Sequence, residues 1–128
     1  MTLKAKKDEA AWAFRRYARL GLHRRHIEVF EAYEIMLGVS KTKRDAAQLL
    51  TVFDTMRLLS MTDPESAEAV AEVYFFDSGR TPKRSDTSMR ILRFATEHNC
   101  DERTVYRRLK SAKELYYHLI RTGFYKNT

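Results

Sequence analysis

Three basic residues near the end of the chain, Arg103, Arg107 and Lys110, recur at spacings of four and three residues. Because each residue of an α-helix turns by about 100°, this spacing places the three side chains on one face. That face is exposed if Val105 points to the interior. Arginine can donate two hydrogen bonds to a guanine edge in the major groove of DNA, and threonine can contact a base or a phosphate. We therefore predict base reading by these three residues and Thr104.

Other side chains near this face suit contacts with the DNA backbone. Basic and hydroxyl groups bind the phosphates that position a protein on a duplex, and such contacts carry no sequence information. We expect this flanking or phosphate-binding role for Arg80, Lys83, Arg84, Arg90, Tyr106 and Arg108.

The net charge of +7 agrees with a nucleic-acid partner. Residues 1–79 contain twelve basic and twelve acidic residues, whereas residues 80–128 contain twelve basic and only five acidic ones. This asymmetry is typical of a nucleic-acid surface. A second basic cluster near the N-terminus has glutamates close by, so we interpret it first as solvated surface and second as a phosphate contact. Its members are Lys4, Lys6, Lys7, Arg15, Arg16, Arg19, Arg24 and Arg25.

Other chemistry has little support in the sequence. His23 and His26 share a predicted helix, but a zinc site needs about four ligands and no suitable cluster completes this pair. Phosphate-binding glycine loops, nucleophile elbows and paired-carboxylate motifs are absent from the sequence. We expect no catalysis, metal or cofactor. The single Cys100 and the lack of a signal peptide or membrane-spanning segment favour a cytoplasmic protein.

Helices are expected to position these residues. The chain of 128 residues is 44% hydrophobic and contains only four Gly and two Pro, which suits an all-α fold with a genuine core. Apolar spacing and cap residues predict about six helices. They lie near 8–20 and 23–37, begin at Thr42 and at Thr62, and lie near 85–98 and 101–122.

The helix faces give more specific expectations. The spacing predicts that the second helix places Ile27, Phe30, Tyr33 and Leu37 on one apolar stripe, and that the fifth helix buries Ile91, Leu92 and Ala95. Trp12 is expected in the core, with a dimer interface as the alternative. The residues that follow Thr42 and Thr62 predict a capping box in one case and a first-turn proline in the other.

The last two predicted helices have the features of a helix-turn-helix. Asn99 tolerates a left-handed backbone, Cys100 is small enough to lie between the helices, and Asp101 caps the next helix. In this motif the second helix places its N-terminal half in the major groove. We assign residues 61–128 to a DNA-binding region and residues 1–60 to a helical region for interaction or dimerisation.

Two segments resemble a known family. They are Glu68-Ala-Val-Ala-Glu-Val-Tyr74 and Cys100-Asp-Glu-Arg-Thr-Val-Tyr-Arg-Arg-Leu-Lys-Ser-Ala112. Over residues 68–120 the chain resembles phage transcriptional activators of the ArpU and RinA type, which are similar to region 4 of bacterial sigma factors. The resemblance implies a helix-turn-helix that binds promoter DNA, and contact with RNA polymerase. The loop at 77–86 is longer than in that region of sigma factors.

The main hypothesis is a sequence-specific transcription regulator, encoded by a phage or mobile element, that binds double-stranded DNA. One alternative is a helical protein-interaction module, for example one that binds RNA polymerase. Another is a DNA-packaging protein like a small terminase subunit, although those usually carry the DNA-binding helices first. The sequence leaves open the target site, activation or repression, and whether the chain forms a homodimer.

Overall fold

The computed structural model describes residues 9–24, 28–75 and 84–122, and over these residues it is all-helical. The α-helices are α2 (Glu9–Arg19), α3 (Val29–Val39), α4 (Lys43–Thr62), α5 (Pro64–Tyr74), α6 (Arg84–Glu97) and α7 (Glu102–Thr122). A short 3-10 helix, η1 (Leu22–Arg24), follows α2. The prediction of an all-α fold with about six helices is confirmed.

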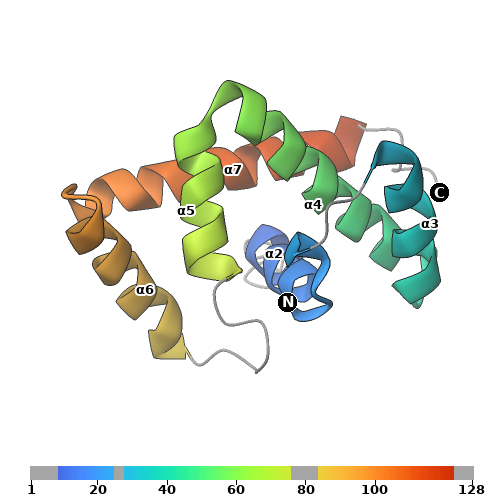
Figure 1. Cartoon of the computed structure of the whole chain (residues 1–128), viewed down its shortest axis with the longest axis horizontal. Helices are drawn as coiled ribbons and strands as arrows, with labels where there is room; N and C mark the ends of the chain where they lie inside the picture. Colours follow the sequence, from blue (N-terminus) through green and yellow to red (C-terminus); the bar gives the residue numbers. More distant parts are fainter. Residues whose placement is uncertain (1–8, 25–27, 76–83, 123–128) are drawn as a thin grey trace.

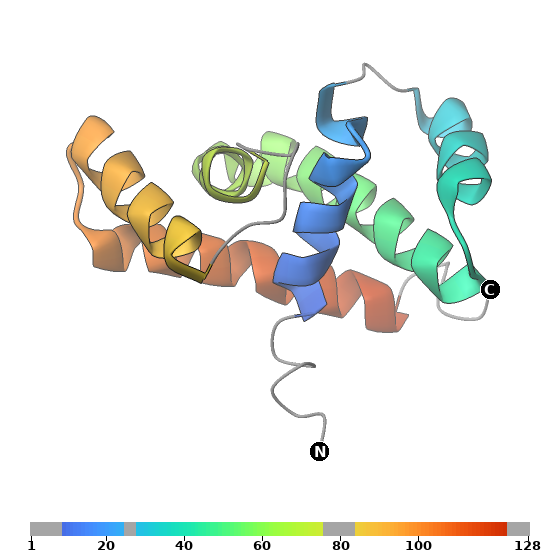
Figure 2. The same cartoon turned by 90° about the horizontal axis from the view of Figure 1, so that it is seen from below.

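Helix α7 runs along the length of the molecule and contacts α2, α4, α5 and α6 (Figures 1 and 2). At one end of the long axis, α3 packs against α4. At the opposite end, α6 lies beside the N-terminal part of α7, and α5 lies next to both (Figure 1). The start of α7 is therefore held by a three-helix unit, α5–α6–α7, far from α3.

One aromatic cluster connects the two ends of the sequence. The ring of Phe14 in α2 is fully buried, and its centroid lies 5.7 Å from Tyr74, 6.5 Å from Phe75 and 5.9 Å from Tyr116. Small inward-facing residues let α2 approach its neighbours closely. These residues are Ala10, Ala11, Ala13 and Ala18. Residues from 1–60 and from 61–128 thus share one core, while the separate roles of these regions remain a prediction.

The expected caps explain where the central helices begin. The hydroxyl of Thr42 accepts a hydrogen bond from the amide of Asp45 at 3.0 Å, as the capping box predicts. The Asp45 carboxylate accepts from the amide of Lys41 at 3.0 Å. Asp63 both ends α4 and caps α5, whose first residue is Pro64. One residue therefore turns the chain sharply between the two helices.

The predicted buried face of α3 is wrong. Phe30 and Leu37 are 91% and 53% exposed, and α3 instead buries Ala32 and Met36. The small side chain of Ala32 allows close packing on α4, which turns the larger residues outward. The helix also begins at Val29, later than the predicted start near residue 23, and Ile27 lies outside the described residues.

Two further predictions of burial are wrong. Trp12 is 46% exposed because it lies about 200° around α2 from Phe14, which faces the core. Leu92 is 53% exposed, whereas Phe94 is buried. In α6 the buried stripe is centred on Ile91, and Leu92 lies about 100° away from it.

Candidate nucleic-acid interface

The turn between α6 and α7 has the local chemistry that the sequence predicts. Asn99 adopts a left-handed backbone with φ of 54°. The amide of Cys100 donates to the carbonyl of Ala95 at 3.0 Å, and its half-buried side chain packs against the core. Asp101 accepts hydrogen bonds from the amide and the hydroxyl of Thr104 at 3.0 and 2.9 Å. These two hydrogen bonds lower the pKa of the Asp101 carboxyl, the one from the amide contributing most.

The N-terminal half of α7 presents an exposed basic face. Val105 and Leu109 are buried, with 0% and 3% exposure, so the opposite side of the helix faces outward. Arg103, Arg107 and Lys110 are all exposed on that side. The structure therefore brings together three of the four residues predicted to read bases. We call this set the α7 basic face.

The α7 basic face has defined limits. Tyr106, which is 51% exposed, lies on its flank toward α6. Glu102 precedes the face and Glu114 follows it, and both are exposed. The acidic Glu102 lies in the first turn, where the partial positive charge of the helix terminus favours it. The basic surface thus covers about two helical turns.

Other predicted DNA contacts hold helices together. The hydroxyl of Thr104 donates to the carboxylate of Asp101, which caps α7. Arg108 is paired with Glu65 of α5 at 3.4 Å, and its side chain is 22% exposed. Arg90 donates to the carbonyl of Val73 at 3.1 Å, which ties α6 to α5. A DNA role for these residues remains a prediction. Arg80, Lys83 and the side chain of Arg84 lie outside the described residues.

The glutamates of α5 contact the turn between α6 and α7. His98 Nε2 lies 3.1 Å from Glu72 Oε2, and Nδ1 lies 3.9 Å from Glu68 Oε1. The imidazole also stacks on Phe94, with ring centroids 4.0 Å apart. The α5 carboxylates therefore engage His98 and Arg108. These contacts hold α7 and the turn before it against α5, on the side away from the buried core.

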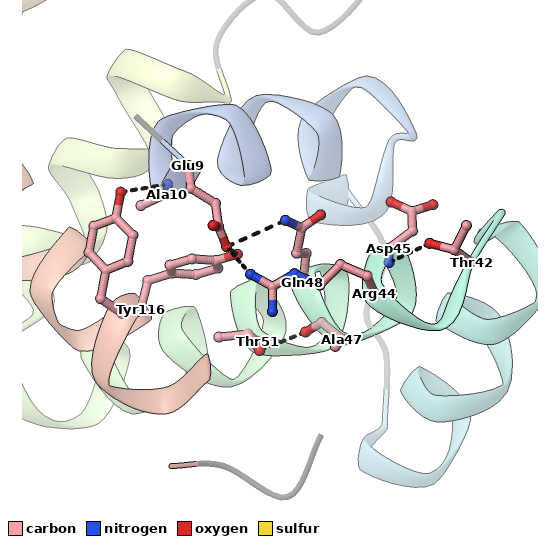
Figure 3. Close-up of polar contacts among 10 residues, drawn as sticks. Glu9, Ala10, Thr42, Arg44, Asp45, Ala47, Gln48, Thr51 and Tyr116 are labelled. Atoms are coloured by element: carbon pink, nitrogen blue, oxygen red, sulfur yellow. Dashed lines mark hydrogen bonds and ion pairs between the residues drawn. The ribbon is translucent and has the colours of Figure 1, made fainter. Parts of the chain in front are cut away.

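A polar cluster anchors the other half of α7 (Figure 3). Glu9 Oε2 accepts hydrogen bonds from Arg44 at 2.8 Å, Gln48 at 3.4 Å and the hydroxyl of Tyr116 at 3.3 Å. Burial, together with the charge of Glu9, raises the pKa of Tyr116 well above its usual value. A carboxylate beside a tyrosine suggests acid–base chemistry, but Glu9 already has three donors. We interpret the cluster as a structural tie between α2, α4 and α7.

Metal binding has no support among the described residues. They contain no group of three or more His, Cys, Asp or Glu side chains placed to hold an ion. The rings of His23 and Phe75 are tilted relative to each other with centroids 5.2 Å apart, and burial lowers the pKa of His23. His26 lies outside the described residues.

An ion pair fixes α2 to the start of α4. Arg16 Nε and Nη2 donate to the two oxygens of Asp45 at 2.7 and 2.6 Å, and the two side chains are only 17% and 12% exposed. The hydrogen bond from Arg16 lowers the pKa of the Asp45 carboxyl, and the amide of Lys41 lowers it further. One arginine of the N-terminal basic cluster thus has a structural role.

This ion pair makes stability dependent on pH. Because the pKa of Asp45 is lowered in the folded state, its contribution is complete above the unfolded-state value near 3.9 and is lost as pH falls through the folded value. We expect Asp45→Asn to lower the free energy of unfolding by about 2 kcal/mol near pH 7. Urea unfolding of both proteins should show this difference shrinking as the pH falls below the unfolded-state value. A difference that stays constant with pH would contradict the assignment.

Within the described ranges, no helix has the length and apolar character needed to cross a bilayer. Comparison with family models, with curated proteins and with solved structures finds no match for this chain.

Proposed function

We propose that this protein binds double-stranded DNA with sequence preference by placing the N-terminal half of α7 in the major groove. The exposure of Arg103, Arg107 and Lys110 on one face of α7 is the observation that carries the proposal. A groove-reading helix must be exposed on its outer side and held rigidly on its inner side. The buried Val105 and Leu109 and the contacts with α5 and α6 meet the second requirement.

The order of helices also supports a helix-turn-helix. In that motif the first helix crosses the DNA backbone while the second enters the groove. Here α6 precedes α7 through a four-residue turn, 98–101, and the two helices meet at one end of the molecule (Figure 1). The resemblance of residues 68–120 to ArpU and RinA activators extends the proposal. It implies a phage-type transcription regulator that contacts RNA polymerase.

The experiment titrates a mixed-sequence duplex with the full chain at several salt concentrations. Fluorescence anisotropy reports the binding and gives the association constant K. If about five phosphates are neutralised, log K should fall with log salt with a slope near −4.5. Lys43→Gln is the matched control, because Lys43 is exposed at the α3 end of the molecule and its loss should leave the slope unchanged. Affinity that does not depend on salt would contradict the proposal.

Protein interaction through α3 is the second candidate. Three apolar residues of α3 are exposed: Val29 by 53%, Phe30 by 91% and Leu37 by 53% of their surface. An exposed apolar surface of this kind usually faces a partner. An antiparallel second copy would place Phe30 of each chain near Leu37 of the other. If this interaction is the whole function, no duplex should bind at moderate salt. Dimerisation and DNA binding are compatible, since α3 and α6 lie at opposite ends (Figure 1).

A further inference from the structure

A concave site lies on the flank of the α7 basic face. It has a volume of about 460 Å³ and lies between α2, α5, α6 and α7. Arg15, Lys110 and Lys113 line it, and Tyr74, Thr87 and Tyr106 supply three hydroxyl groups. None of the described residues lining it is acidic.

Two cations of this pocket lie near the same aromatic ring. The guanidinium carbon of Arg15 is 5.1 Å from the centre of the Tyr74 ring, and Lys113 Nζ is 5.6 Å from the same centre. The ring attracts each cation, but two like charges at one ring repel each other. A bound anion would offset that repulsion.

The Arg15 side chain is held in a suitable orientation. Its Nη2 donates to the hydroxyl of Thr87 at 2.8 Å, and its guanidinium carbon lies over the Tyr74 ring. A guanidinium has five N–H donors in a planar fork that matches phosphate oxygens. One donor serves Thr87, and among the described residues the other donors have no hydrogen-bond partner. Lysine ammonium groups bind phosphate as point charges.

We propose that this pocket binds a phosphate of the DNA backbone next to the bases that α7 contacts, an inference that rests on the proposed function. Tyr106 and Lys110 connect the two surfaces, because both line the pocket and adjoin or belong to the α7 basic face. Arg15 therefore brings α2, from the N-terminal half, into the DNA interface. Lys113 is a further phosphate contact.

The test compares the full-length protein with the double variant Arg15→Gln/Lys113→Gln by anisotropy on several duplex sequences. At about 0.1 M salt each lost phosphate contact should weaken binding roughly tenfold, equally for all sequences. The salt slope should become shallower by about 1 per contact. Arg15→Lys, which keeps the charge, should retain most of the affinity. Arg19→Gln, an exposed change on the same helix, is the matched control.

Other outcomes separate this inference from the proposed function. If the wild type shows the expected salt slope and the double variant matches it, the phosphate pocket is wrong and the α7 interface stands. If Arg15→Lys loses binding as the double variant does, while its salt slope stays that of the wild type, Arg15 has a structural role. That result would also overturn the phosphate pocket.

A second titration uses inorganic phosphate and follows the amide signals of Thr87 and Lys113. Saturable shifts that disappear in the double variant support an anion site in this pocket. If they occur in a protein that binds no duplex, both the DNA source of the phosphate and the proposed function fail. No shift together with unchanged DNA affinity in the double variant overturns the inference.

Discussion

Replacing Arg107 with alanine is expected to relax sequence preference and to weaken binding of the preferred duplex by about 1 to 3 kcal/mol. Arg107 is exposed in the second turn of α7, between Arg103 and Lys110 on the same face. A bidentate contact from arginine to the guanine edge distinguishes that base from the other three. Its removal should therefore reduce affinity for the preferred site much more than affinity for other DNA.

The measurement is a competition between the preferred duplex and a scrambled one, for the wild type and for Arg107→Ala. The ratio of the two affinities should fall in the variant. Lys43→Gln, at the other end of the molecule, should leave the ratio unchanged. Equal losses on both duplexes would instead assign Arg107 a contact with the DNA backbone.

Replacing Phe14 with alanine is expected to lower the free energy of unfolding by about 3 to 5 kcal/mol. This is a large part of the roughly 5 to 15 kcal/mol that a domain of this kind has. Phe14 is fully buried and contacts the rings of Tyr74, Phe75 and Tyr116, so its loss leaves a cavity where α2, α5 and α7 meet. Urea unfolding followed by circular dichroism measures the change.

Trp12→Ala is the matched control, because it removes a larger aromatic ring from the same helix. Trp12 is 46% exposed, so its replacement should cost less than Phe14→Ala despite the greater change in volume. If both variants lose equal stability, the indole must be covered, as in a dimer interface. If Trp12→Ala costs more, the position of α2 in the core is wrong.

The sequence predicts helix ends well where caps are local. The Thr42 and Asp101 caps form hydrogen bonds with residues three positions later, so nearby residues alone determine them. The left-handed Asn99 is another local feature, and it was also predicted correctly. The separation of a buried and an exposed face in α7 was predictable because only one side of that helix is apolar.

Periodicity is less informative where apolar residues occupy more than one side of a helix. In α3, one face carries Ala32 and Met36 and another carries Phe30 and Leu37, and spacing alone does not say which one packs. The structure selects the face with the small alanine, which permits close contact with α4. The same ambiguity explains the error at Leu92, which adjoins the buried Ile91.

The phosphate pocket depends on contacts that no local pattern contains. Arg15 and Thr87 are 72 residues apart in sequence, and their hydrogen bond forms only when the tertiary fold brings the side chains of α2 and α6 within reach of each other. The N-terminal basic cluster provided a signal, but it did not distinguish its members. In the structure Arg16 forms an ion pair with Asp45, whereas Arg15 donates to Thr87 of α6 and lines the pocket.

The most direct test of DNA reading by α7 is selection of duplexes from a random-sequence pool by the purified full chain. We expect enrichment of one short motif, and a repeat with Arg107→Ala should lose preference at one position of it. A palindromic motif would in addition indicate binding by two copies. If repeated rounds leave the selected pool as random as the starting pool, the chain does not read DNA sequence, and the central proposal is wrong.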